Sequence, residues 1–308
     1  MIINKILGKM KSEYQKEYVI YPQNLFKKHY YIIRREPPGA GFFSNFLYVV
    51  GQMEYALDKN YIPVVDMENY KTLYNEEQMI EGTNNAWEYY FSQPGQMSLA
   101  EAYASGNYIL SNYIIYEKYM PCKDAGKFEV DQKLLMRIAV DIEKYIHIKK
   151  DILNRVEKFV GEKFTGNVLG VHIRQTDSKV FNPGHKIGAS LQDYLKAVQT
   201  IVEERTVDTI FVATDENGVL EILRERYGSK VISTDAFRGE KGTTEGIHLK
   251  EDNEKRRGSH KYRLGEEVLE DMLLLSKADY FVFGRSNVAA TAMIFNNNQY
   301  KRWIAVKF

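Results

Sequence analysis

Two hydrophobic periods alternate along the second half of the chain. Short apolar runs are each followed by a longer segment whose apolar residues recur every three or four positions, as on one face of a helix. The predicted strands are 168–174, 209–213, 230–233, 280–283 and 303–306, and the predicted helices are 191–204, 219–227, 266–276 and 287–296. This alternation predicts a parallel sheet covered by helices on both faces, which is a doubly wound, nucleotide-binding type of domain.

The first half of the chain contains one similar unit. Residues 30–34 predict a strand, and the Pro- and Gly-rich residues 36–41 predict a turn. The apolar spacing over 46–59 predicts a helix, and residues 62–66 predict a second strand. Strand, turn, helix and strand together make one βαβ unit.

The middle of the chain separates these two patterns. Residues 68–119 are rich in Tyr, Asn, Gly and Glu with weak periodicity, and no element is assigned there. Residues 131–160 predict one or two amphipathic helices. We therefore expect an α/β chain of two domains, an N-terminal α/β domain over 1–160 and a C-terminal nucleotide-binding domain over 161–308.

Composition narrows the class of protein. The 308 residues carry a formal net charge of +1, so we expect no general nucleic-acid binder, whose affinity would require a basic surface. The single cysteine, Cys122, excludes an intrachain disulfide and favours a reducing compartment. No apolar run reaches membrane-spanning length, so we expect a cytoplasmic protein. The basic residues Lys5, Lys9 and Lys11 leave peripheral contact with the inner face of the membrane open.

The first strand of the second half ends abruptly in polar residues. His172, Arg174 and Asp177 follow the apolar run directly. In open α/β sheets ligands bind beyond the carboxyl ends of the strands, and the planar fork of an arginine suits phosphate oxygens. The alternative is a buried Arg174–Asp177 pair that only closes the strand.

Three further strand ends carry polar residues that would meet at the same edge. They are Thr214–Asp215–Glu216, Ser233–Thr234–Asp235 and Gly284–Arg285–Ser286–Asn287. A glycine followed by a helix N-terminus is suited to an anion, although Ser286 is equally suited to be an ordinary helix cap. Asp215 also suits the N-cap of the helix from residue 219. Asp271 lies in an apolar helix, and its residue pattern alone favours a solvent-facing side chain over a buried partner.

Other motifs add little. The glycine turn at 38–45 suits phosphate but lacks the dinucleotide spacing, and neither a P-loop nor a Gly-x-Ser-x-Gly elbow occurs. The six histidines never fall in a metal-type pair, so no metal and no cofactor is predicted. The long polar loop 241–260 is typical either of a lid or of a solvated charged segment.

The run His172–Ile173–Arg174–Gln175–Thr176–Asp177, followed by Ala213–Thr214–Asp215, by 271–280 and by Ser286–Asn287, resembles the α1,6-fucosyltransferase family and its wider fucosyltransferase relatives. The resemblance covers roughly the last 140 residues. It implies two facing Rossmann-like domains of the GT-B type, GDP-fucose as the donor, inversion at the sugar carbon and no required metal.

The resemblance also implies roles for individual residues. The motif arginine would grip the donor diphosphate, the helix aspartate would contact guanine or ribose, and the serine loop would bind phosphate. The implied donor-binding residues are Gly39, Gly41, Asn45, His172, Asp215, Asp271, Arg285, Ser286 and Asn287. The predicted catalytic residues are Arg174, Asp177 and His185.

The chain departs from the family at two places. Family members often have a second basic residue after the motif arginine, where this chain has Gln175. The carboxylate expected a few residues beyond the motif is missing, so we expect Asp177 or His185 to deprotonate the acceptor hydroxyl. The expected acceptor is a glycan or a lipid-linked oligosaccharide. Use of another nucleotide sugar, or a non-catalytic binding module on the same scaffold, remains the alternative.

Overall fold

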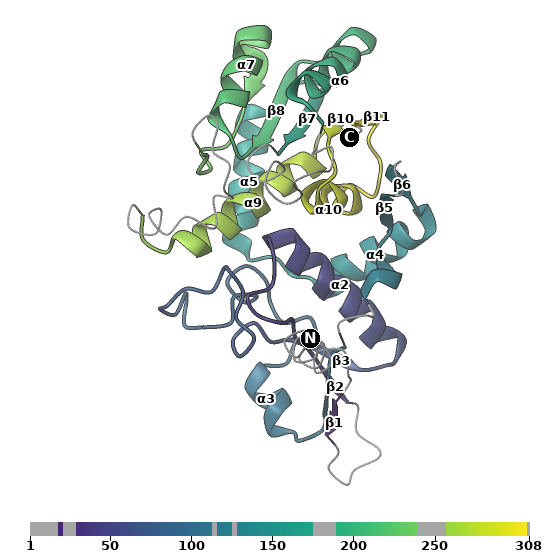
Figure 1. Ribbon diagram of the computed structural model, residues 1–308, viewed down its shortest axis with the longest axis vertical. Coiled ribbons are helices and arrows are strands. Elements are labelled where there is room, and N and C mark those ends of the chain that lie inside the picture. Colours follow the sequence, from purple (N-terminus) through teal and green to yellow (C-terminus); the bar gives the residue numbers. More distant parts are fainter. Residues whose placement is uncertain are drawn as a thin grey trace, which may run out of the picture. The chain divides into compact units, whose positions relative to one another are not determined.

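The computed structural model describes residues 18–20, 29–112, 116–124, 128–174, 189–239 and 257–306. The chain divides into two compact units (Figure 1). Unit 1 takes its described residues from Met1–Pro121 and Met136–Lys149, and unit 2 takes them from Cys122–Leu135 and Lys150–Phe308. Among the described residues, no helix combines the length and the apolarity that crossing a membrane requires.

Unit 1 is built on a four-stranded sheet in the order β1-β4-β2-β3. Strands β2, β3 and β4 run parallel, and β1 is antiparallel to β4. The elements are β1 (Tyr18–Ile20), β2 (Tyr30–Ile33), α2 (Phe42–Asp58), β3 (Ile62–Val65), α3 (Leu99–Ala104), β4 (Tyr108–Leu110), the 3₁₀ turn η1 (Tyr116–Tyr119) and most of α4 (Gln132–Tyr145). The predicted βαβ unit is therefore present as β2, α2 and β3.

Helix α2 begins four residues before the predicted start at residue 46, because Phe42 and Phe43 are buried. The Phe42 ring lies 4.9 Å from the ring of Tyr90 and 5.3 Å from that of Tyr74, between centroids. Both partners come from the segment 68–119 that sequence periodicity left unassigned. Tertiary burial of aromatic rings thus extends the helix beyond its local apolar pattern.

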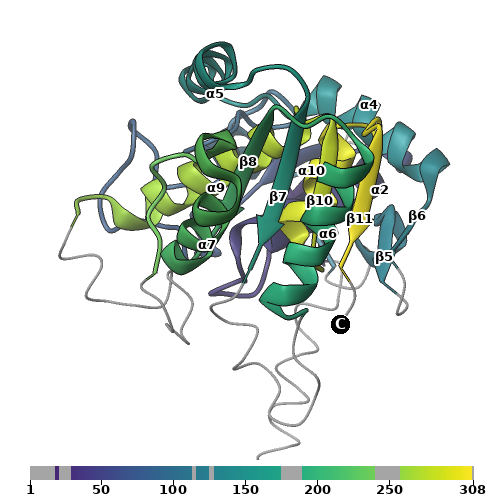
Figure 2. The ribbon, with the colours of Figure 1, turned by 90° about the horizontal axis from the view of Figure 1, so that it is seen from above.

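Unit 2 is built on a five-stranded sheet in the order β11-β10-β7-β8-β9, and all neighbouring strands are parallel (Figure 2). Its elements are the hairpin β5 (Cys122–Asp124) and β6 (Phe128–Val130), α5 (Lys150–Lys163), β7 (Val168–Ile173), α6 (Leu191–Glu204), β8 (Thr209–Thr214), α7 (Asn217–Tyr227), η2 (Gly228–Lys230), β9 (Val231–Ile232), α9 (His260–Ser276), β10 (Tyr280–Phe283), α10 (Asn287–Phe295) and β11 (Arg302–Ala305). The expected fold class, α/β with a doubly wound parallel sheet in the C-terminal half, is confirmed.

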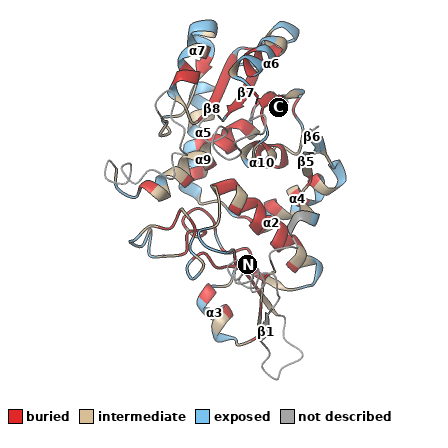
Figure 3. Cartoon of the chain, in the orientation of Figure 1, coloured by how far each residue is buried: buried red, intermediate tan, exposed pale blue. Residues whose placement is uncertain are grey.

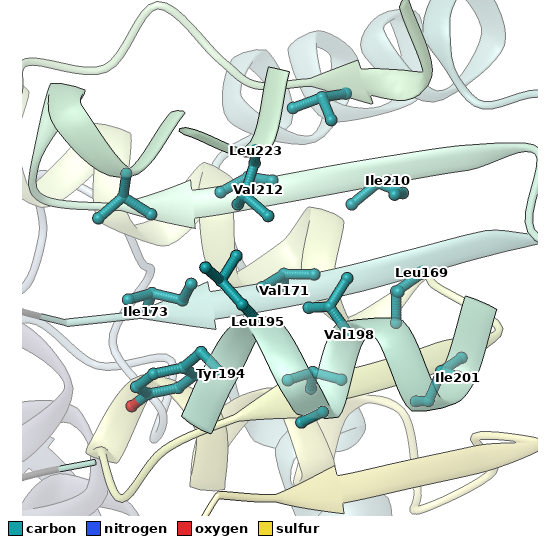
Figure 4. Packing of buried hydrophobic residues seen from close by; sticks show 14 of the residues in the cluster. Leu169, Val171, Ile173, Tyr194, Leu195, Val198, Ile201, Ile210, Val212 and Leu223 are labelled. Atoms are coloured by element: carbon teal, nitrogen blue, oxygen red, sulfur yellow. The ribbon is translucent and has the colours of Figure 1, made fainter. Parts of the chain in front are cut away.

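The core of unit 2 lies between the sheet and helices α6 and α7. Alternate residues of β7, Leu169, Val171 and Ile173, pack against the buried apolar face of α6 (Figure 4). Helices α9 and α10 lie on the opposite side of the strands (Figures 1 and 2). The central strands β7, β8 and β10 are therefore buried throughout, whereas α6 and α7 are buried along one face only (Figure 3).

The division into units differs from a single boundary after residue 160. The hairpin β5–β6 belongs to unit 2, because the ring of Phe128 lies 4.9 Å from Phe283 and 5.9 Å from Trp303. Helix α5 belongs to unit 2 as well, because Arg155 forms ion pairs with Glu266 and Glu270 of α9.

Candidate functional site

The carboxyl ends of β7, β8, β9 and β10 share one edge of the sheet of unit 2. The strand order reverses between β7 and β10, since β8 and β9 extend the sheet on one side of β7 and β10 and β11 extend it on the other. His172 is paired in register with Phe283, and Ile173 with Thr214. The polar residues after these strands therefore gather around a topological switch point, where doubly wound proteins bind ligands.

His172 and Ser286 meet at this switch point, although they are 114 positions apart in the sequence. The Ser286 hydroxyl lies 3.2 Å from Nδ1 of His172, and it accepts a hydrogen bond from the backbone N–H of Ala289 at 3.0 Å. Ser286 is thus the N-cap of α10, as the sequence allowed. Burial, with a smaller contribution from the charge of Arg174, lowers the pKa of His172 to about 3, so the imidazole is neutral.

Arg174 lies at the end of β7 with its side chain exposed. Arg285 and Asn287, beside the start of α10, are exposed as well, while Gly284 is buried. An arginine side chain at the surface can offer its planar donors to the oxygens of an anion. Arg285 precedes the N-terminus of α10, whose dipole favours negative charge, and Arg174 follows the neighbouring strand β7.

Asp271 is buried, which corrects the solvent-facing interpretation that its residue pattern favoured. The Thr234 hydroxyl donates a hydrogen bond to Oδ1 of Asp271 at 2.7 Å. Arg238 holds the same loop, because its guanidinium donates to the Thr234 carbonyl at 2.9 Å. Burial raises the pKa of Asp271 to about 7, against the opposing effects of the Thr234 hydrogen bond and of the Arg238 charge. The third strand end and the helix aspartate thus form one cluster.

Asp215 does not cap the helix that follows it. Helix α7 begins at Asn217, its N-cap is Glu216, and the cap side chain makes no capping hydrogen bond. Instead the Asp215 carbonyl accepts the N–H of Gly239 at 2.8 Å. Backbone pairing with residue 239 therefore positions this strand end.

Tyr194 is a member of the edge that sequence reasoning missed. It lies in the first turn of α6, and its side chain is 4% exposed. Its hydroxyl lies so close to Gly284 that a Cβ added to this glycine would be only 1.8 Å from the Tyr194 oxygen. Burial, and secondarily the charge of Asp215, raises the pKa of Tyr194 to about 12. The apolar spacing of α6 marks Tyr194 as an ordinary core residue, so no sequence signal distinguished it.

The glycine turn before α2 belongs to unit 1. Gly39 has φ +71°, and a side chain there would meet the Asn45 amide. Asn45 accepts from Ala40 N–H at 3.1 Å, donates to Ala40 carbonyl at 2.8 Å and accepts from Arg35 at 2.8 Å. The Asn45 side chain thus holds the turn from inside, and Gly41 immediately precedes the helix.

Several predicted features fall outside the described residues or do not involve the edge. Asp177, His185 and nearly all of the loop 241–260 lie outside the described residues, whereas His260 is the first residue of α9. Burial raises the pKa of the Cys122 thiol to about 12, which makes it an unreactive thiol. In the part of the chain that the structure describes, no group of three or more His, Cys, Asp or Glu side chains is arranged to hold a metal ion.

Comparison with known proteins finds relatives in structure only. No family model matches the sequence, and no curated protein matches it. The α1,6-fucosyltransferase NodZ co-crystallised with GDP has a TM-score of 0.55 and 15% identity, and the match covers 88% of this chain and 92% of that one. NodZ soaked with GDP-fucose has a TM-score of 0.54 and 16% identity, with 87% and 93% covered. The Bradyrhizobium fucosyltransferase NodZ has a TM-score of 0.53 and 15% identity, with 86% and 92% covered.

At these identities the likeness concerns the fold. It extends over both units, whereas the sequence resemblance covered only the second half. The chain therefore has the α/β fold of the fucosyltransferase NodZ along nearly the whole length of both proteins.

Proposed function

We propose that this chain is a glycosyltransferase that moves fucose from GDP-fucose to a hydroxyl of a glycan acceptor, with inversion at the sugar carbon and without a metal. The observation that carries the proposal is the fold likeness to NodZ, whose structures were determined with GDP and after soaking with GDP-fucose. The meeting of His172 with Ser286 supports it, because the motifs that resemble fucosyltransferases converge at one sheet edge.

The donor diphosphate would lie at the switch point of unit 2. Arg174 and the N-terminus of α10 supply positive charge there, and exposed Arg285 adds to it. Asp271, held by Thr234, would accept hydrogen bonds from the guanine or the ribose. Asp215 would contact the donor from the end of β8. Within unit 1, the glycine turn with Gly39, Gly41 and Asn45 would offer backbone amides to a ligand, since the Asn45 side chain is engaged within the turn.

The reaction would be an in-line displacement. The acceptor oxygen forms a bond to the anomeric carbon while the bond from that carbon to the diphosphate oxygen breaks, and GDP departs. Arg174 and the helix amides would stabilise the negative charge on the leaving diphosphate. The acceptor proton would pass to Asp177 or His185. If both Asp177→Asn and His185→Ala kept wild-type turnover across the pH–rate profile, neither residue would be the base.

Calorimetric titration with GDP-fucose, GDP-mannose and UDP-glucose tests the donor assignment. We expect the GDP-sugars to bind with and without added magnesium, and we expect binding to be lost in Arg174→Ala. Transfer of fucose to an oligosaccharide then tests catalysis. GDP binding without transfer or hydrolysis would identify a non-catalytic module, preferred binding of UDP-glucose would identify another donor, and no binding to any of the three would overturn the proposal.

A further inference from the structure

The Tyr194 hydroxyl lies against Gly284, at the strand edge proposed to bind the donor. The ring packs in the core cluster between the sheet and α6, beside Ile173 (Figure 4). The oxygen points away from the aliphatic side chains of Leu195 and Val198 (Figure 4). The ring thus belongs to the core, whereas the hydroxyl leaves it.

Gly284 receives this hydroxyl. An ideal Cβ on Gly284 would lie 1.8 Å from the Tyr194 oxygen and 2.8 Å from its Cζ atom. The phenol therefore rests directly on the backbone that joins β10 to α10, two residues before the helix cap Ser286. The hydroxyl and the start of α10 therefore lie at the same part of the sheet edge.

The hydroxyl has no hydrogen-bond partner among the described residues, although the side chain is only 4% exposed. Two other buried tyrosines, Tyr300 and Tyr31, have hydroxyls that are paired. Tyr300 donates to the Leu275 carbonyl at 3.1 Å, and Tyr31 donates to Gln52 at 2.8 Å. The hydroxyl of a tyrosine with a buried ring ordinarily has a partner, so the Tyr194 oxygen at the end of its buried ring points to a ligand that completes it.

The surroundings define the chemistry of that ligand. The raised pKa of Tyr194 keeps the phenol protonated, so it offers an O–H donor. The hydroxyl lies beside the backbone that leads into the N-terminus of the nine-residue helix α10. The charge that acts on the phenol is that of Asp215, which follows β8. An O–H donor at the N-terminus of a helix matches a phosphate oxygen.

We propose that the Tyr194 hydroxyl donates a hydrogen bond to a phosphate oxygen of the nucleoside diphosphate bound over Gly284. The inference rests on the proposed function and adds to it a binding residue from the opposite face of the sheet to α10. Gly284 is required because any side chain there would displace the phenol.

Tyr194→Phe tests the inference, because it removes only the hydroxyl. We expect calorimetry to show roughly a ten- to hundredfold weaker affinity for GDP and for inorganic pyrophosphate, as for the loss of a hydrogen bond to a charged group. Affinity for guanosine, which has no phosphate, should be unchanged. The melting temperature should also be unchanged, since the hydroxyl has no protein partner among the described residues.

Tyr227→Phe is the matched control, because Tyr227 ends α7 in the same unit and its buried hydroxyl also lacks a partner among the described residues. This variant should bind GDP like the wild type. Equal GDP affinity in Tyr194→Phe and the wild type would overturn the inference and leave the proposed function intact. A loss of guanosine affinity as large as the loss of GDP affinity would have the same consequence. Pyrophosphate binding that weakens in Tyr194→Phe, without any affinity for GDP, would support the phosphate contact and overturn the GDP-sugar assignment. A wild type that binds neither GDP nor pyrophosphate would overturn both.

Discussion

His172 and Asp271 both lie near the carboxyl edge of the sheet of unit 2. Burial shifts the pKa of each residue in the direction that favours its neutral form. The pKa of His172 falls to about 3, so the imidazole stays neutral at physiological pH. The pKa of Asp271 rises to about 7, so its charge changes within the physiological range. The two groups therefore differ in what they offer a ligand, a fixed neutral ring and a titrating carboxyl.

Asp271→Asn should change how stability depends on pH. The pKa of Asp271 is about 7 in the folded chain against its ordinary value of 3.8, so the folded state binds more protons between these values. The stabilisation that protonated Asp271 gives to the folded state is complete below pH 3.8 and is lost as the pH rises through about 7. Relative to the wild type, Asp271→Asn should therefore gain stability from pH 5 to pH 8, by on the order of a few kcal/mol. Urea unfolding at several pH values measures this.

Thr234→Val provides the control for Asp271. It removes the hydroxyl that donates to the carboxylate, so the pKa of Asp271 should rise further and the loss of stability should move to higher pH. A difference between Asp271→Asn and the wild type that is constant across pH would contradict the assignment of a buried, titrating carboxyl.

Arg174→Ala should lower fucosyl transfer by about a hundredfold or more, since it removes one donor to the leaving diphosphate. Its side chain is exposed, so the melting temperature should change little. Arg224→Ala, at an exposed position of α7, is the control and should keep full activity. Steady-state transfer from GDP-fucose and thermal unfolding measure the two effects. Full activity in Arg174→Ala would show that the site assignment is wrong.

At the scale of elements, the turn between β10 and α10 depends on a contact with α6. Gly284 is buried, and the Tyr194 side chain of α6 fills the space beside it. Ser286 then starts α10 by accepting the N–H of Ala289. Helix α6 on one face of the sheet thus restricts the residue at position 284, in the turn that leads into α10 on the other face.

Gly284→Ala should destabilise the chain by about 1–3 kcal/mol, as expected for overpacking, because the new Cβ would clash with the Tyr194 hydroxyl. The cost should be smaller in a Tyr194→Phe background, where the oxygen is gone, but it should not vanish, because Cζ would still lie 2.8 Å from the Cβ. Denaturant unfolding of the double-mutant cycle measures the coupling. Strictly additive effects would show that the contact is not made.

At the scale of the whole molecule, the two units each contain a sheet with parallel strands, and polar residues follow the carboxyl ends in both. In unit 2 these residues surround the switch point, and in unit 1 the glycine turn follows β2. The amino edge of the unit 2 sheet is closed by structural contacts instead. Asp208 and Asp279 accept the N–H groups of Asn167 and Val168 there.

Binding of GDP should therefore protect one edge of the unit 2 sheet from hydrogen exchange. We expect slower exchange in the backbone amides of 214–217 and 284–289, and unchanged exchange in 165–168 and 277–280 at the other edge. Saturating GDP at a hundred times its dissociation constant should add about 2.7 kcal/mol to the free energy of unfolding. Exchange and chemical denaturation with and without GDP measure both effects, and protection confined to the amino edge would contradict the assignment.

Much of unit 2 was predictable because its helices are amphipathic and carry local end signals. Helix α6 was predicted at its observed bounds, and Ser190 with Asp193 forms the capping box that begins it. Helix α9 begins six residues before the predicted start at residue 266. Arg257 pairs with Glu267 beside this extra turn, and His260 is buried against Phe237. Such long-range contacts leave no periodic pattern.

From residue 167 onward, the sequence by itself determined the order of strands and helices, the parallel sheet and the polar strand ends, because these follow from local periodicity and from the geometry of βαβ connections. Only the tertiary structure decided that Asp271 is buried on Thr234, that Asp215 caps no helix, and that the Tyr194 hydroxyl lies over Gly284. Burial and pairing join residues distant along the chain. Their effects on charge and on hydrogen bonding arise only when the elements pack.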